Sequence, residues 1–152
     1  MLGSYTNLID ELMNDQPKYN TDCYVFLLSK AYQKGRKLVQ KRLKPYGLTN
    51  VQYLVLEALW RKAGLTAVEL GTGLNIDKAT MSGILERMVD SELIVKKQDE
   101  LDSRMMRLFP SEAANAIQDE VVEERKAANE ELLAGFSLEE KVLLRRLLLD
   151  IV

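Results

Sequence analysis

The segment LDSRMMRLFPS, residues 101–111, sets one acid and two arginines among apolar side chains. Asp102 stands two residues before Arg104, so its carboxylate can pair with the guanidinium and fix its direction. An oriented arginine suits the minor groove of DNA, because a narrow groove concentrates negative potential. The alternative is a solvated hairpin whose charges only protect an edge strand from aggregation.

Other kinds of site are excluded or unsupported by composition. The 152 residues include no histidine and one cysteine, Cys23. Without an imidazole, Ser-His-Asp and Cys-His catalysis are excluded, and a metal site of thiols and imidazoles within one chain is not expected. The eight glycines are scattered and form no phosphate loop. We therefore expect neither an enzyme nor a cofactor nor a metal.

Length and charge favour a single intracellular domain. The chain suits one domain over residues 1–152, and no apolar run approaches the ~18–20 residues that span a bilayer. Residues 1–15 carry no basic residue, unlike a signal peptide, so a cytoplasmic protein without a membrane partner is expected. The net charge is −2, yet residues 30–44 contain seven basic residues and no acid. A chain with charge distributed so unevenly can bind DNA through one basic face, although a solvated helix face is the simpler interpretation of residues 30–44.

Capping signals divide the chain into helices. Thr49, Thr66 and Ser137 each begin a capping box, and Asp77 and Ser111 are plausible simple N-caps. Apolar spacing then predicts helices at about 22–44, 50–62, 67–74, 78–91, 112–134 and 138 to the end, with a small extra helix at about 4–14. Residues 93–97 and 104–109 look like two short strands around a polar turn. Three helices followed by a hairpin is the order of a winged helix-turn-helix.

The helix at 78–91 has the pattern of a DNA-recognition helix. Its spacing turns Met81, Ile84, Leu85 and Met88 inward and leaves a small, hydroxylated opposite face. Small side chains permit close approach in a major groove about 12 Å wide. An ordinary amphipathic helix would also have a polar face, and Glu86 and Asp90 count against contact with DNA.

The run from Gly64 to Ala113 resembles the winged helix-turn-helix of the MarR family of bacterial transcriptional regulators, and QYLVLEALW (52–60) resembles the preceding helix. The match covers roughly residues 22–115, and the wing motif Asp102-x-Arg104 is its most specific feature. The resemblance implies a mainly α fold with a small β-hairpin wing. A winged lobe at about 48–110 would lie between dimerisation helices at about 1–46 and 111–152. It also implies a homodimer on a palindromic operator in double-stranded DNA, often released by a small aromatic or phenolic effector or by oxidants.

Carried over by position, the resemblance implies two sets of DNA contacts. Arg104 would enter the minor groove with Asp102 holding it, and the phosphate or positioning contacts would be Arg87, Lys96, Lys97 and Arg107. The residues facing the major groove would be Lys78, Ala79, Thr80, Ser82 and Gly83. The sequence departs from the family at Gly83, where several members have arginine, and at Glu92, where a glycine usually ends the helix. Further departures are Pro110 in the second strand and Ala114 after the wing.

Two further sites are predicted outside the lobe. The apolar C-terminal helix suggests a dimer interface, although it could instead complete the monomer's core. The interface residues expected are Leu8, Leu12, Leu144, Leu147, Leu148 and Ile151. An effector pocket would have walls from Tyr24, Tyr32, Tyr53 and Trp60, with Arg36 to meet a carboxylate. Aromatic residues at helical spacing are, however, more often part of a core.

Cys23 raises the alternative of a thiol-based oxidant sensor. In the peroxide-sensing branch of the family, the reactive cysteine would match Val25, and its tyrosine partners would fall on Ser29 and Val39. The sequence therefore favours a DNA-binding repressor released by a small aromatic ligand. The alternatives are a helical adaptor protein that does not bind DNA, and an oxidant-sensing repressor that uses Cys23.

Overall fold

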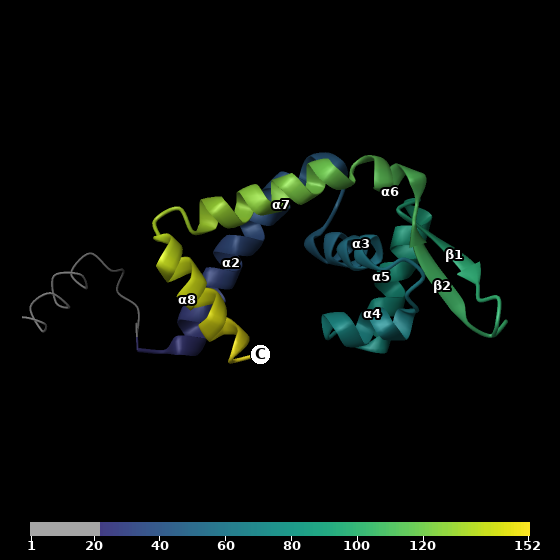
Figure 1. Cartoon of the computed structure of the whole chain (residues 1–152), viewed down its shortest axis with the longest axis horizontal. Helices are drawn as coiled ribbons and strands as arrows, with labels where there is room; N and C mark the ends of the chain where they lie inside the picture. The colour runs from purple at the N-terminus through teal and green to yellow at the C-terminus, as the bar shows by residue number, and fades with distance from the viewer. Residues whose placement is uncertain (1–21) are drawn as a thin grey trace, which may run out of the picture. The chain divides into compact units, whose positions relative to one another are not determined.

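The computed structural model describes residues 22–152, so the short helix expected at about 4–14 lies outside the described residues. The chain divides into two compact units at Gln33 and Lys34, and α2 runs from the first into the second. In chain order the elements are α2 (Tyr24–Leu43), the 3-10 turn η1 (Lys44–Tyr46), α3 (Asn50–Arg61), α4 (Ala67–Leu74), α5 (Lys78–Asp90), β1 (Ile94–Gln98), β2 (Met106–Pro110), α6 (Glu112–Ala116), α7 (Gln118–Leu132) and α8 (Leu138–Leu149) (Figure 1). The mainly helical fold with one hairpin is as predicted.

The helix starts are fixed by the predicted caps. The Thr49 hydroxyl accepts from the Gln52 backbone N–H at 3.3 Å, and the Gln52 side chain accepts from the Thr49 N–H at 2.8 Å. The same reciprocal pair starts α4 and α8, while Asp77 and Ser111 cap α5 and α6 with single bonds. Each cap satisfies backbone donors that a helix start leaves unpaired.

The helix predicted at 112–134 is wrong in one respect, because α6 and α7 are separate helices. The break is at Ile117 (φ −100°, ψ 2°), in a stretch without glycine or proline. Ile117 is partly buried and packs against the hydrophobic core. Tertiary packing therefore overrides a locally favourable helix at this position. The strands are also displaced by one or two residues from the predicted 93–97 and 104–109.

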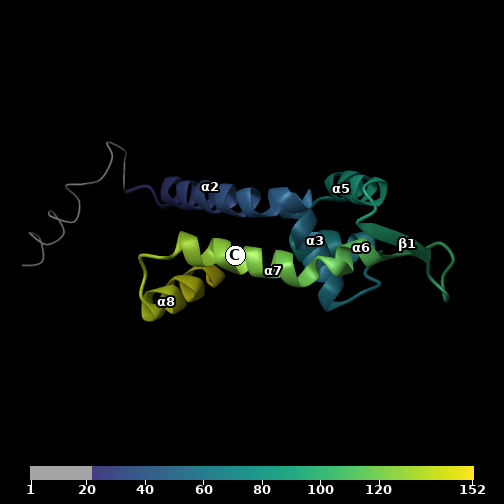
Figure 2. The same cartoon turned by 90° about the horizontal axis from the view of Figure 1, so that it is seen from above.

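The winged lobe is built from α3, α4, α5 and the hairpin. The predicted inward stripe of α5 is buried, together with residues of α3 such as Tyr53 and Leu56. β1 and β2 are antiparallel, with Lys96 opposite Leu108 and Lys97 opposite Arg107. Leu65, in the loop before α4, adds an isolated antiparallel bridge to Leu108. Figure 2 shows the hairpin loop projecting beyond the helices of the lobe.

The C-terminal helix α8 has no buried residue, although it contains LEEKVLLRRLLL. Its large apolar side chains stay exposed, among them Leu143, Leu147, Leu148 and Leu149. Among the described residues they add nothing to the core of the lobe, and their role as a dimer interface stays a prediction. Within residues 22–152, no helix is long and apolar enough to cross a membrane.

Candidate DNA-binding site

The outer face of α5 is small, polar and open. Asp77 caps the helix by accepting from the Thr80 N–H at 3.0 Å. Hydrogen bonds from the Thr80 side chain and backbone lower the pKa of Asp77. Gly83 lies beside the Arg87 side chain, and a Cβ on Gly83 would make an ordinary contact of 3.5 Å with Arg87 Nη1. Gly83 is half-buried, and the other residues predicted to face the major groove are exposed: Lys78, Ala79, Thr80 and Ser82. The helix thus presents a surface on which a groove edge can approach the backbone closely.

One acid shares this face. Ser82 Oγ donates to Glu86 Oε1 at 3.4 Å, so the carboxylate lies one turn along from the small residues. Glu86 is exposed and would repel a phosphate placed beside it. The N-terminal half of α5, rather than its whole length, is therefore the part suited to approach DNA.

The turn between α4 and α5 depends on a close backbone approach. Asn75 adopts the left-handed conformation (φ 53°), and the Ile76 N–H donates to Gly71 O at 2.8 Å. A Cβ at position 71 would lie 2.9 Å from Ile76 O, which is closer than real contacts allow. Gly71 therefore fixes the angle at which the recognition helix leaves the turn.

The end of α5 explains the departure from the family pattern at Glu92. This residue has φ 57°, the left-handed region that side chains disfavour, and it follows the C-cap Ser91. The Leu93 N–H closes the turn on Met88 O at 2.9 Å. A glycine would adopt this conformation without strain. The chain therefore retains the turn geometry at the cost of backbone strain at Glu92.

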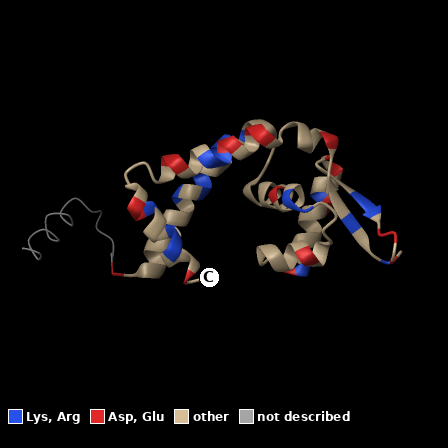
Figure 3. Cartoon of the chain, viewed as in Figure 1, with Lys and Arg blue, Asp and Glu red and all other residues tan. Residues whose placement is uncertain are grey.

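The strands of the wing carry cations, and the turn between them carries acids (Figure 3). Lys97 and Arg107 are directly opposite each other, an arrangement of like charges that destabilises a strand pair. The two side chains find different partners. Lys97 Nζ lies 5.2 Å from the centre of the Phe109 ring, and Arg107 pairs with Asp99. Lys96 and Lys97 are exposed, as contacts with phosphate require.

The predicted pair at the wing tip is present. Asp102 Oδ1 accepts from the Arg104 backbone N–H at 3.0 Å and from Arg104 Nε at 3.2 Å. The Arg104 side chain is 89% exposed, whereas that of Asp102 is 38% exposed. The acid therefore orients an arginine that still projects into solvent, which is the geometry expected for insertion into a groove.

Arg107, predicted as a phosphate or positioning contact, has partners within the protein. Its Nε donates to Asp99 and its Nη1 donates to Gly64 O at 2.8 Å, and its side chain is 39% exposed. Sequence reasoning missed Asp99 as a functional candidate. The available signal was an Asp at the start of a polar turn, where its carboxylate commonly accepts backbone N–H groups. Nothing local pointed to Arg107 as its partner.

Asp99 is the acid most strongly affected by its surroundings in this region. Hydrogen bonds from Arg107 first, and then from the Asp102 and Leu101 N–H groups, lower its pKa to about 2. A carboxyl whose pKa is lower in the folded protein stabilises the fold above its unfolded pKa of about 4. That contribution is lost as the pH falls through about 2. The contacts of Asp99 are therefore complete at neutral pH.

The residues predicted to line an effector pocket differ in their exposure to solvent. Tyr53 is 1% exposed in the core of the lobe, edge-on to Trp60, whose Nε1 donates to Asn115 at 3.1 Å. Tyr53 is therefore part of the core, and Trp60 links α3 to α6 through Asn115. Tyr24, Tyr32 and Arg36 are exposed. A groove of about 240 Å³ lies between α3 and α4, and its lining includes Leu54, Glu57, Ala58, Arg61, Glu69, Leu70 and Leu74.

The residues predicted for dimerisation and oxidant sensing are accessible where they are described. Leu147, Leu148 and Ile151 are 44%, 40% and 68% exposed, and Leu144 is half-buried. Leu8 and Leu12 lie outside the described residues. Cys23 is a free, exposed thiol. The interface and the thiol role both stay predictions.

Comparison with known proteins agrees with this geometry. A model of the MarR family matches residues 46–105. The HTH-type transcriptional regulator MgrA of Staphylococcus aureus is 29% identical over 109 residues, which cover 72% of this chain and 74% of that protein. The organic hydroperoxide resistance transcriptional regulator of Bacillus subtilis is 30% identical over 98 residues, covering 64% of this chain and 67% of that one.

The structural comparison extends beyond the winged lobe. A structure of BpsR from Bordetella bronchiseptica, from work on the regulation of its DNA binding by 6-hydroxynicotinic acid, superposes with a TM-score of 0.81. It is 25% identical, and the match covers 90% of this chain and 97% of that one. The sequence relatives, the shared fold and the oriented Asp102–Arg104 pair lead to one assignment. This chain belongs to the MarR family and is a winged-helix transcriptional regulator.

Proposed function

We propose that this DNA-binding regulator represses transcription as a homodimer on a palindromic operator and is released by a small aromatic or phenolic ligand. The observation that carries the proposal is the wing tip, where Asp102 aims an almost fully exposed Arg104. A regulator whose partner is chromosomal DNA would act in the cytoplasm.

The two halves of the lobe would read DNA differently. The exposed N-terminal half of α5 would enter the major groove and touch base edges through Thr80, Ser82 and Ala79. Arg104 would read the width of the neighbouring minor groove, where negative potential is strongest. Lys96 and Lys97 would add phosphate contacts that raise affinity without specifying sequence.

Dimerisation is supported by α8, which has no fully buried leucine in the part of the chain that the structure describes. A second copy would cover this apolar surface and would place two recognition helices about 34 Å apart, one turn of DNA. A symmetric dimer requires a symmetric site, and from this we infer the palindrome. Occupancy of such an operator would block transcription.

Release by a ligand is supported by one relative, since DNA binding by BpsR is regulated by 6-hydroxynicotinic acid. A ligand releases a regulator when it binds more tightly to a conformation that does not fit DNA. The groove between α3 and α4 borders the first helix of the helix-turn-helix. A ligand bound in this groove would change the position of α5 directly.

The experiment is in vitro selection of duplexes with the purified protein, followed by fluorescence anisotropy with the selected duplex at two salt concentrations. We expect a palindromic consensus and affinity that falls steeply with salt. The Arg104→Ala variant should bind about 1–3 kcal/mol more weakly while its dimer stays intact.

Arg61→Ala is the matched control, because it removes an exposed arginine on α3, outside the wing, whose side chain pairs with Glu57. It should bind as the wild type does. Recovery of no consensus sequence would reject the proposed function, and equal affinities for Arg104→Ala and wild type would reject the role of the wing tip.

A further inference from the structure

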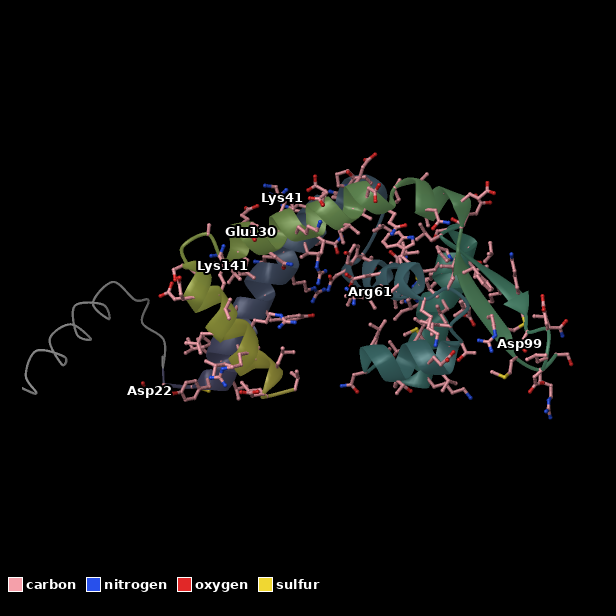
Figure 4. All side chains as sticks on the ribbon, in the orientation of Figure 1. Asp22, Lys41, Arg61, Asp99, Glu130 and Lys141 are labelled. Atoms are coloured by element: carbon pink, nitrogen blue, oxygen red, sulfur yellow. The ribbon has the colours of Figure 1, made fainter. Side chains whose placement is uncertain are left out.

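Arg107 and Asp99 join the wing to the loop that precedes the helix-turn-helix. Arg107 Nη1 donates to Gly64 O at 2.8 Å, and Gly64 lies two residues before the N-cap of α4. Its Nε donates to Asp99 at the start of the wing turn, where Figure 4 labels this residue. The Arg107 side chain is 39% exposed, against 89% for Arg104. Arg107 is thus a poor candidate for a free phosphate contact.

Asp99 organises the turn that carries the minor-groove arginine. Its side chain is 8% exposed, and Oδ1 accepts from the N–H groups of Leu101 at 2.8 Å and Asp102 at 2.9 Å. Its other oxygen accepts from Arg107. The backbone of Asp102 is therefore fixed by the same carboxylate that binds Arg107.

The contacts form a continuous chain from the lobe to the wing tip. It runs from Gly64 O through Arg107 and Asp99 to the backbone of Asp102, whose side chain holds Arg104. A charge-assisted pair whose carboxylate is largely shielded from water holds one geometry more firmly than exposed neutral hydrogen bonds do. The pKa of Asp99, lowered to about 2, keeps the pair charged at neutral pH.

We propose that Asp99 and Arg107 are positioning residues for DNA recognition, which form a clasp that sets the wing tip relative to the helix-turn-helix and so aims Arg104 at the minor groove. The inference rests on the proposed function, since it needs a DNA site for the wing to read. It assigns to Arg107 an indirect action through Asp99, in place of direct contact with phosphate.

The test uses the full-length protein and the palindromic duplex selected with the wild type. Asp99→Asn keeps an oxygen for the two backbone N–H groups and removes the charge that binds Arg107. Simple electrostatics predicts tighter binding, because a negative charge is lost near DNA. The clasp predicts the opposite sign, a loss of affinity of at least about fivefold, the lower end for one well-placed arginine.

Glu100→Gln is the matched control, since it removes a negative charge from the same turn at an exposed residue outside the clasp. It should bind as tightly as the wild type or more tightly. Asp99→Ser is a second variant whose hydroxyl can still cap the turn, and it should weaken binding as Asp99→Asn does. Thermal unfolding of each variant checks that the lobe is folded.

Two further measurements separate the clasp from a phosphate contact. Arg107→Gln should weaken binding without changing the slope of log affinity against log salt, whereas a lost phosphate contact lowers that slope by about 0.9. The double variant Asp99→Asn/Arg107→Gln should bind no more weakly than either single variant, because the first change already opens the clasp.

The clasp is overturned if Asp99→Asn binds as tightly as Glu100→Gln, if the two losses add, or if Arg107→Gln lowers the salt slope. These outcomes leave the proposed function standing, because the wild type still recognises its duplex. Failure of the wild type to select any duplex removes the proposed function and, with it, the clasp's role in DNA recognition.

Discussion

The winged lobe and α8 are both rich in apolar residues, yet they use them in opposite ways. In the lobe, Leu56, Leu59 and Met88 are fully buried among α3, α4, α5 and the hairpin. In α8, Leu147, Leu148 and Leu149 remain 40–54% exposed. The lobe thus has its own core and can hold a binding surface in shape. The helix α8 has apolar surface that needs another surface to cover it, which is why function in this chain is expected to depend on assembly.

A charge placed on α8 tests most directly whether its apolar surface is covered by a second copy of the chain. Leu147→Glu should convert the dimer to a monomer, because an unpaired carboxylate would be buried in the interface. Coupling of two half-sites would then be lost, and operator affinity should fall by at least about 100-fold. Sedimentation and anisotropy measure the two effects.

Val68→Glu controls for the chemical change, since Val68 is an exposed apolar residue of α4, 69% accessible. It should sediment as the wild type does. A Leu147→Glu protein that remains dimeric would show that α8 is not the interface.

Truncation in the lobe should have a different signature. Leu56→Ala removes a fully buried side chain and should lower the free energy of unfolding by about 2–5 kcal/mol. The lobe's core lies within one chain, so the difference in free energy of unfolding between Leu56→Ala and wild type should not depend on protein concentration. The corresponding difference for Leu147→Glu should depend on it. Chemical denaturation at two concentrations measures this. A concentration-dependent difference would mean that the lobe core is completed by the partner.

Two glycines of α4 test how tightly the lobe is built. Gly71→Ala should destabilise the protein by about 1–3 kcal/mol, since its Cβ would press on Ile76 O and shift the turn. Gly73→Ala, where a Cβ meets no atom within 4 Å, should stabilise it by about 0.5–1 kcal/mol. Thermal unfolding gives both values, and shifts of the same sign would contradict the described turn.

A substitution at Glu92 should give a smaller change in stability of the same lobe. Glu92→Gly should raise the free energy of unfolding by about 1 kcal/mol, because glycine adopts φ 57° without strain. Glu112→Gly, at an exposed position in the first turn of α6, has no such strain to relieve and should be destabilising. A loss of stability in Glu92→Gly would imply that the left-handed turn is not adopted in solution.

Cys23, outside both regions compared, should have the smallest effect. Cys23→Ser should change neither operator affinity nor its response to peroxide, as the sequence places the family's reactive position at Val25. Peroxide-triggered release of the wild type that the serine variant lacks would establish a thiol sensor instead.

Local signals were sufficient to predict much of the fold. The caps at Thr49, Thr66, Asp77 and Ser137 all depend on residues within three positions, and each forms as predicted. The inward stripe of α5 follows from helical periodicity, and it is buried. The Asp102–Arg104 pair is likewise two residues apart. Interactions this short in sequence can be read from the residue types alone.

The tertiary structure decided what depends on residues far apart in the chain. The sequence predicts Arg107 as a phosphate or positioning contact, and folding pairs it with Gly64, 43 residues earlier, and with the carboxylate of Asp99. The break at Ile117 and the packing of Tyr53 and Trp60 likewise follow from the core that surrounds them. The sequence by itself determined the capped helices, the wing and the family, because their signals are local. Which polar groups are left free to meet DNA was decided only by folding, because a side chain's partners depend on the whole packed lobe.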